Sequence, residues 1–134
     1  MQIGLLEDNP SIVDWLSTAL GMAGHSVYPY HDGPSLLAYL FAKETIPTSI
    51  PYDLLVVDLY LPGRMSGLDV INFIRKAIPP ERLPIIVISA ASLSELDLLQ
   101  ANHPDIPVLQ KPYQLRRLLW WMKTLSSDPD ESTV

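Results

Sequence analysis

The stretch Leu54-Leu55-Val56-Val57-Asp58 decides the fold, because four consecutive apolar residues run directly into a single acid. A strand that is apolar at every position has both faces covered, which is typical of parallel sheets in α/β proteins. The carboxyl ends of parallel strands meet at one edge of the sheet, where open α/β sheets bind their ligands. We therefore expect one polar site at that edge, because three further apolar runs also end in polar residues: Ile3-Gly4-Leu5-Leu6 in Glu7-Asp8, Ile85-Ile86-Val87-Ile88 in Ser89, and Val108-Leu109-Gln110 in Lys111.

Helix-like segments separate these runs along the chain. Apolar residues recur at the 3.6-residue period of a helix, for example at Ile12, Leu16 and Leu20 after Pro10, a residue that suits the first turn. Parallel neighbours need helical crossovers, so five strands alternating with five helices predict an α/β protein with a doubly wound parallel sheet. The patterns place strands at 2–6, 26–30, 53–57, 84–88 and 106–109, and helices from 10 to between 21 and 24, at about 34–44, at 67–77, at about 93–101 and from 112 to 125.

Composition limits the class of protein. At 134 residues and 48% hydrophobic, the chain suits one domain with a real core, which we place at residues 1–125. The polar acidic segment 126–134 is expected to be a disordered tail. With no cysteine, disulfides and thiolate metal sites are excluded. The net charge of −6 argues against direct binding of nucleic acid, and the absence of a leader-like or spanning segment predicts a cytoplasmic protein that binds no membrane.

The polar sites, in this order, resemble those of the receiver domain of two-component response regulators, from residue 2 to about 125. The matching pieces are Glu7-Asp8, Asp58 within Val-Val-Asp-Leu-Tyr-Leu-Pro-Gly, Ser89-Ala90 and Lys111-Pro112-Tyr113. Each motif is weak alone, and together at the ends of strands they are specific. The resemblance implies a flavodoxin-like sheet of order 2-1-3-4-5. It also implies phosphorelay signalling, in which Asp58 accepts a phosphoryl group from a histidine kinase or phosphotransfer protein.

The residue types suit that chemistry. A carboxylate can attack an activated phosphorus to give an acyl phosphate, but Asp58 and the phosphoryl group are both anionic, so positive charge is needed around the transition state. Glu7 and Asp8 make sense as ligands of Mg²⁺, a hard ion that binds through a few carboxylates plus phosphate. By the resemblance, Asp58 itself and the backbone carbonyl of Tyr60 complete the metal site.

Two further residues complete the expected site. Lys111 would bring a second, compact positive charge to the phosphoryl oxygens, and Ser89 would donate a hydroxyl hydrogen bond to them. The chain is then a phosphoacceptor signalling domain, not an enzyme, whose own chemistry is limited to self-catalysed transfer and slow autodephosphorylation. Tyr60 and Ala91 occupy positions that tune this hydrolysis in the family, and neither ionises near neutral pH to assist a water.

Each residue also has a plain structural alternative. Asp58 alone reads as a turn residue, the Glu7-Asp8 pair as acids at a helix start, Lys111 as a solvated lysine and Ser89 as a helix cap. Their joint occurrence at strand ends favours the phosphoacceptor site. The runner-up is a degenerate receiver that acts only as a protein-interaction module. An aspartyl-phosphate phosphatase is a weaker alternative, because Tyr60 stands where a second acid would be needed.

Two further features concern signalling output, and the first of them departs from the pattern of the family. Val108 stands where the family usually has an aromatic residue that moves with the hydroxyl residue, so we expect it merely to pack in its strand. Trp120 and Trp121 point about 100° apart on a helix, so one should reach the surface beside Arg116 and Arg117. An exposed Trp beside Arg is typical of interface hot spots, and the alternative is a ring lying flat over the core. The resemblance places a protein target or homodimer contact on the face of helix four, strand five and helix five.

Overall fold

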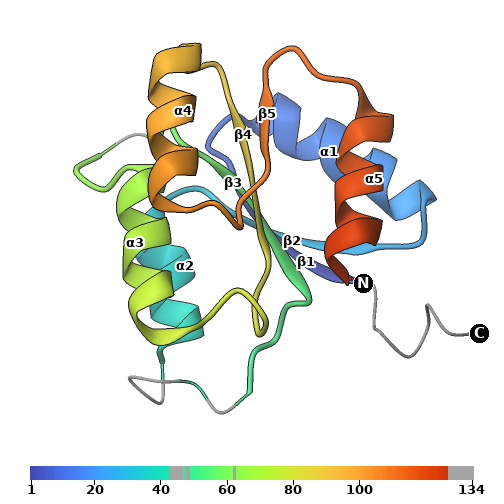
Figure 1. The fold of residues 1–134 in the computed structure, drawn as a ribbon. Coiled ribbons are helices and arrows are strands. Elements are labelled where there is room, and N and C mark those ends of the chain that lie inside the picture. Colours follow the sequence, from blue (N-terminus) through green and yellow to red (C-terminus); the bar gives the residue numbers. More distant parts are fainter. Residues whose placement is uncertain (43–46, 48, 62, 127–134) are drawn as a thin grey trace, which may run out of the picture.

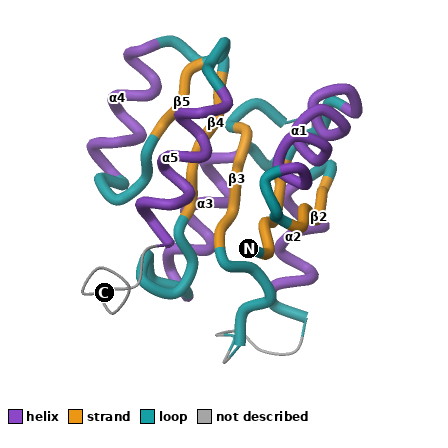
Figure 2. Tube along the Cα trace, turned by 90° about the vertical axis from the view of Figure 1, so that its right-hand side faces the viewer, coloured by secondary structure: helices purple, strands orange, loops and turns teal. Residues whose placement is uncertain are grey.

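The protein is described by a computed structural model that covers residues 1–42, 47, 49–61 and 63–126. Within these residues, five strands alternate with five helices: β1 (Gln2–Leu6), α1 (Pro10–Met22), β2 (Ser26–Tyr30), α2 (Gly33–Leu40), β3 (Leu54–Asp58), α3 (Gly67–Ala77), β4 (Ile85–Ser89), α4 (Leu93–Asn102), β5 (Val108–Gln110) and α5 (Leu115–Ser126). All neighbouring strands are parallel, and their order is β2-β1-β3-β4-β5. Figure 2 shows β3, β4 and β5 following one another across the sheet, with β2 at the opposite border from β5. The doubly wound sheet of order 2-1-3-4-5 is confirmed.

The sheet separates two layers of helices (Figure 1), each of which packs on it through an apolar cluster. Helices α2, α3 and α4 cover one face, and α1 and α5 cover the other. Strands β3 and β4 are buried at every position, as the unbroken apolar runs predict for strands covered on both faces. Alternate residues of β3 therefore pack into opposite layers, with Leu55 and Val57 in one and Leu54 and Val56 in the other.

The strand register brings the expected site residues to one edge. Leu6 lies opposite Val57, so Glu7 follows β1 at the level where β3 ends in Asp58. Asp58 lies opposite Ile88, which puts Ser89 one residue further along β4. Ser89 lies opposite Gln110, and the Lys111 amide donates to the Ser89 carbonyl at 2.7 Å.

The start of α3 fixes the segment that follows β3. Ser66 caps the helix, its side chain accepting from the Asp69 amide while the Asp69 carboxylate accepts from the Ser66 amide. Gly67 permits a close approach of this helix start to the end of β3, because a Cβ there would lie 2.2 Å from the Asp58 carbonyl oxygen. The Gly67 amide also donates to the Leu59 carbonyl at 3.0 Å.

Arg75 ties the far end of α3 to its surroundings. Its guanidinium donates to the carbonyls of Ile78 and Leu83, at 3.3 and 2.9 Å, and forms an ion pair with Asp105 at 3.1 Å. With 10% of its side chain exposed, Arg75 joins the end of α3 to the segments before β4 and after α4.

The prediction that the last helix begins at Pro112 is wrong: α5 begins at Leu115. Lys111 is still hydrogen-bonded to β4, so the chain remains attached to the sheet at that residue and needs Pro112 to Gln114 to reach the helix start. Strand β5 also begins two residues later than predicted, because the Ile106 amide bonds to the His103 carbonyl in the turn after α4.

Smaller differences affect other element ends. Helix α2 ends at Leu40, short of the predicted residue 44, and β3 and β4 each lie one residue later than predicted. The expected tail begins with Ser126, which is the last residue of α5, and its remaining residues 127–134 lie outside the described part of the chain. Val108 packs, partly buried, against the core between the sheet and α2, α3 and α4, in keeping with a packing role.

Strand β2 forms one open edge of the sheet, and its residues are exposed or half-buried. Hydrogen bonds join it to β1 through the Ser26 amide, which donates to the Met1 carbonyl, and through the Tyr30 carbonyl, which accepts from the Glu7 amide. The Tyr30 hydroxyl also bonds to the Tyr52 hydroxyl.

Candidate functional site

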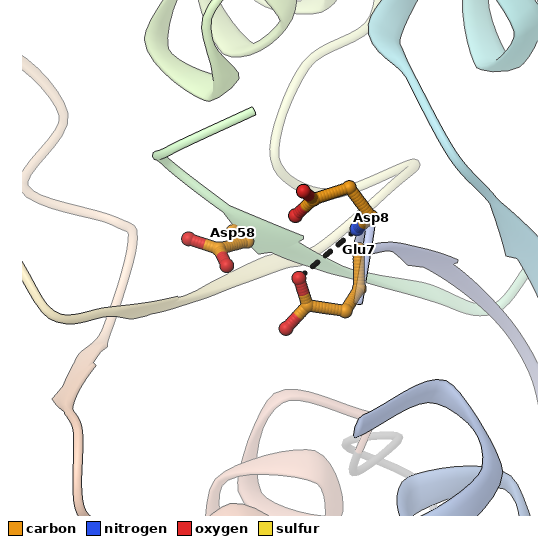
Figure 3. A group of neighbouring side chains, drawn as sticks. All are labelled: Glu7, Asp8 and Asp58. Atoms are coloured by element: carbon orange, nitrogen blue, oxygen red, sulfur yellow. Dashed lines mark hydrogen bonds between the residues drawn. The ribbon is translucent and has the colours of Figure 1, made fainter. Parts of the chain in front are cut away.

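Three carboxylates meet at the carboxyl edge of the sheet (Figure 3). Glu7 and Asp8 follow β1, and Asp58 is the last residue of the neighbouring strand β3. One oxygen from each lies within 4.8 Å of the others, and no other group with metal-ligand spacing occurs among the residues that the structure describes. Glu7 and Asp58 are buried, at 1% and 4% exposure, whereas Asp8 is exposed. An oxygen-only donor set of this kind suits a hard divalent cation such as Mg²⁺.

Lys111 lies between the two buried acids. Its Nζ donates to Asp58 Oδ2 at 2.9 Å and to Glu7 Oε1 at 3.2 Å. Burial alone would lower the pKa of this ammonium group, but the hydrogen bonds and negative charges of Asp58 and Glu7 raise it above its usual value. The lysine therefore stays charged and offsets part of the carboxylate repulsion.

The pKa of the Glu7 carboxyl group is strongly shifted in the folded protein. Burial, and then the charge of Asp58, raise its pKa from 4.5 to about 7, against the opposing effect of Lys111. Its Oε2 also accepts from the Asp8 amide at 3.0 Å, the bond dashed in Figure 3. This bond holds the two consecutive acids in one arrangement at the end of β1.

Ser89 is fully buried at the end of β4, the strand beside β3. Its Oγ accepts from the Ala91 amide at 3.0 Å, and this bond leaves the hydroxyl hydrogen available for another acceptor. Gln110 Nε2 donates to the Ala91 carbonyl at 3.1 Å, which attaches the segment after β4 to β5. The sequence did not single out Gln110, because this contact depends on the pairing of β4 with β5.

Tyr60, two residues beyond Asp58, links two sides of the site. Its amide donates to Asp58 Oδ1 at 3.0 Å, and its hydroxyl donates to Glu95 Oε2 at 2.5 Å. The hydrogen bond to Glu95 raises the pKa of the phenol, which is therefore neutral near pH 7. Glu95 was not predicted as part of the site, because Ser92-Leu93-Ser94-Glu95 reads from sequence only as a helix start.

The surface of α5 carries the exposed tryptophan that the helical spacing predicts. Trp120 is 59% exposed, while Trp121 is partly buried and packs against the core under α1 and α5. Their rings meet edge to face, with centroids 4.7 Å apart, and line a shallow surface hollow with Arg116 and Arg117. The prediction that one of the two rings reaches the surface is confirmed.

Several proteins are similar to this chain. The transcriptional regulatory protein TctD of Salmonella typhimurium is 31% identical over 118 residues, which cover 88% of this chain and 48% of that protein. The transcriptional regulatory protein HprR of Escherichia coli is 29% identical over 119 residues, covering 89% and 48%. The chain thus spans about half the length of these curated relatives. No helix in the described part of the chain is long and apolar enough to cross a membrane.

Solved structures have the same fold. The response regulator protein TrrA of Thermotoga maritima, determined in complex with Mg²⁺-BeF, superposes with a TM-score of 0.73 at 27% identity and covers 92% of this chain and 97% of its own. The chemotaxis protein CheY4 of Vibrio cholerae superposes at 0.75 with 21% identity, covering 92% and 97%, and supports the fold alone. The family model for the response regulator receiver domain matches residues 3–122. The chain therefore belongs to the receiver domains of response regulators, the family that carries phosphorelay signalling in two-component systems.

Proposed function

We propose that Asp58 accepts a phosphoryl group from a histidine kinase or phosphotransfer protein, and that Mg²⁺ is required. The observation that carries this proposal is the arrangement of the buried Asp58, with Lys111 bonded to one carboxylate oxygen and two further acids beside it. A structural acid at a strand end needs neither a second buried acid nor a shared lysine. The donor set fits Mg²⁺, which Glu7, Asp8, Asp58 and the backbone carbonyl of Tyr60 would hold, and which would neutralise phosphoryl oxygens when bound.

The side chains divide the chemistry between them. An oxygen of Asp58 forms a bond to phosphorus while the bond to the donor breaks, and its electron pair leaves with the donor. Lys111 begins bonded to Asp58 and can transfer hydrogen bonds to the phosphoryl oxygens as charge moves there. Ser89, whose hydroxyl proton is available, donates to the same group and draws the segment after β4 toward it.

Phosphorylation from a small donor tests this proposal. With acetyl phosphate and Mg²⁺, the protein should gain the mass of one phosphoryl group, and Asp58→Asn should gain none. Asp97→Asn is the matched control, because Asp97 is an exposed acid on α4 and should be phosphorylated like the wild type. An equal gain in Asp58→Asn, or a gain in the presence of a chelator, would refute the assignment. No gain at all would favour a degenerate receiver that only binds proteins.

We also propose that the face of α4, β5 and α5 binds a protein target or a second copy of the chain, with Trp120 as an anchor. Exposed aromatic area beside Arg116 and Arg117 supports this, since Trp and Arg dominate interface hot spots. Light scattering with and without beryllofluoride, an acyl-phosphate mimic, would detect dimer formation, and Trp120→Ala should abolish it. Trp15→Ala is the matched control, because Trp15 is a 51% exposed tryptophan on α1. Dimerisation that is unchanged in Trp120→Ala would contradict this role.

A further inference from the structure

The segments that follow β3 and β4 are joined to each other beyond the strand ends that carry Asp58 and Ser89. The joint is the hydrogen bond from the Tyr60 hydroxyl to Glu95, which links the loop after β3 to the first turn of α4. Because β3 and β4 are neighbours in the sheet, this bond crosses from one side of the site to the other. The proposed phosphoryl transfer assigns no role to either of these two side chains, since Tyr60 contributes only its backbone carbonyl to the metal site.

Both ends of this link are fixed by other contacts. The Tyr60 amide is bonded to Asp58 itself, which holds the backbone of Tyr60 beside the phosphoacceptor residue, while the hydroxyl contact to Glu95 sets the direction of the ring. At the other end, the Glu95 amide donates to Ser92 Oγ at 3.3 Å, which holds Glu95 in the capped first turn of α4. The intervening Ala91 is small and 1% exposed, so its side chain does not reach over the site. Tyr60 is therefore the large side chain that reaches from the loop after β3 to the first turn of α4.

We propose that Glu95 is a positioning residue that holds the Tyr60 ring over the mouth of the site and thereby slows hydrolysis of the acyl phosphate on Asp58. The inference rests on the proposed function, because it concerns the loss of the phosphoryl group that Asp58 accepts. In that reaction a water oxygen bonds to phosphorus and the bond from phosphorus to the Asp58 oxygen breaks. The electron pair returns to the carboxylate, and the water protons leave with inorganic phosphate.

Geometry explains why a ring at this place delays the reaction. The water must approach phosphorus opposite the Asp58 oxygen, which is the solvent side of the strand ends, between the loops after β3 and β4. A neutral phenol bonded to a carboxylate neither accepts a proton from that water nor repels it, so its effect is to occupy the path. Glu95 acts only through Tyr60, because it has no contact with Asp58 among the described residues.

The lifetime of the phosphorylated protein tests the proposal. Wild type, Tyr60→Phe, Glu95→Ala and the double variant are loaded with acetyl phosphate and Mg²⁺, freed of donor, and followed by intact mass. Removing one hydrogen bond of ordinary net strength should shorten the lifetime about two- to tenfold in either single variant. The double variant should be no faster than the singles, because both changes remove the same contact.

Two controls separate positioning from charge and from general loosening of α4. Glu95→Gln keeps an oxygen that can accept from the phenol and should restore a lifetime near that of the wild type. Asp97→Ala removes an exposed acid from the same helix without touching Tyr60 and should leave the lifetime unchanged. A purely structural role for the bond would lower the melting temperature of Glu95→Ala and leave its lifetime equal to that of the wild type.

The outcomes distinguish this inference from the proposed function. Equal or longer lifetimes in Tyr60→Phe and Glu95→Ala, in proteins that do become phosphorylated, would overturn the positioning role alone. Multiplicative effects in the double variant would do the same, because they would show that the two side chains act separately. A wild-type protein that takes up no phosphoryl group would overturn the proposed function and this inference with it.

Discussion

The metal-free protein should lose stability as the pH rises from about 5 to about 7, and replacing Glu7 with glutamine should abolish most of that loss. The pKa of Glu7 is raised from 4.5 to about 7 by burial and by the charge of Asp58. Between these two values the folded protein binds a proton that the unfolded chain has released. The free energy of unfolding must therefore fall as the pH rises through that window, and below about 4.5 the contribution is fully present.

The size of the effect follows from the same two values. A rise in the pKa from 4.5 to about 7 corresponds to about 3 kcal/mol at about 1.4 kcal/mol per tenfold change in proton affinity. Glu7 is 1% exposed, so solvent does little to screen this charge. Glutamine resembles the protonated acid in shape and cannot ionise, so Glu7→Gln should be about as stable as the wild type at pH 5 and more stable at pH 8.

Urea unfolding in the presence of a chelator, at several pH values between about 5 and 8, would measure this difference. The three histidines are present in both proteins, so their contributions to the pH dependence cancel in the comparison. Saturating Mg²⁺ should restore stability to the wild type at pH 8, because a cation neutralises the ionised acid. Parallel pH profiles for the wild type and Glu7→Gln would refute the account of this site.

Three further predictions concern other parts of the molecule. Gly67→Ala should lower stability by about 1–3 kcal/mol, because its Cβ would collide with the backbone of Asp58 and Leu59; Gly21→Ala, with open space around it in α1, should be neutral or stabilising by thermal melting. Arg75→Ala should cost about 2 kcal/mol through its lost hydrogen bonds in urea unfolding, while the exposed Lys76→Ala should change little. Beryllofluoride should change hydrogen exchange across residues 90–104, because Ser89 moves toward the phosphoryl mimic and Val108 is too small to relay that motion through β5; changes confined to the loop after Asp58 would place the output surface elsewhere.

The local sequence was enough to predict the order of elements and the place where the acids gather. Unbroken apolar runs such as 54–57 identify buried parallel strands, and parallel strands oblige Glu7 and Asp58 to share an edge. The start of α5 escaped prediction because Pro112 is compatible with the first turn of a helix, and only the hydrogen bond of Lys111 to β4 shows that the chain has not yet left the sheet there.

Contacts between distant segments account for what the sequence could not predict. The raised pKa of Glu7 depends on how deeply the end of β1 is covered, which no local pattern of apolar residues reports. The pairing of Tyr60 with Glu95 joins residues 35 positions apart, and each of them has an ordinary local role as a loop aromatic or a helix-start acid. To predict the contact between Tyr60 and Glu95, one would have to know the paths of the loops after β3 and β4 in advance.

The open edge at β2 bears on how the molecule behaves at high concentration. In a parallel ladder, alternate residues face the neighbouring strand, and Ser26 and Tyr30 face β1. Pro29 belongs to the other set of alternate residues, which face away from β1, and its backbone nitrogen carries no hydrogen to donate. The opposite edge is the three-residue β5, which is too short to template a long ladder. Neither border of the sheet therefore offers a full row of donors to another chain, and growth of fibrils by stacking sheets edge to edge is disfavoured in the folded state.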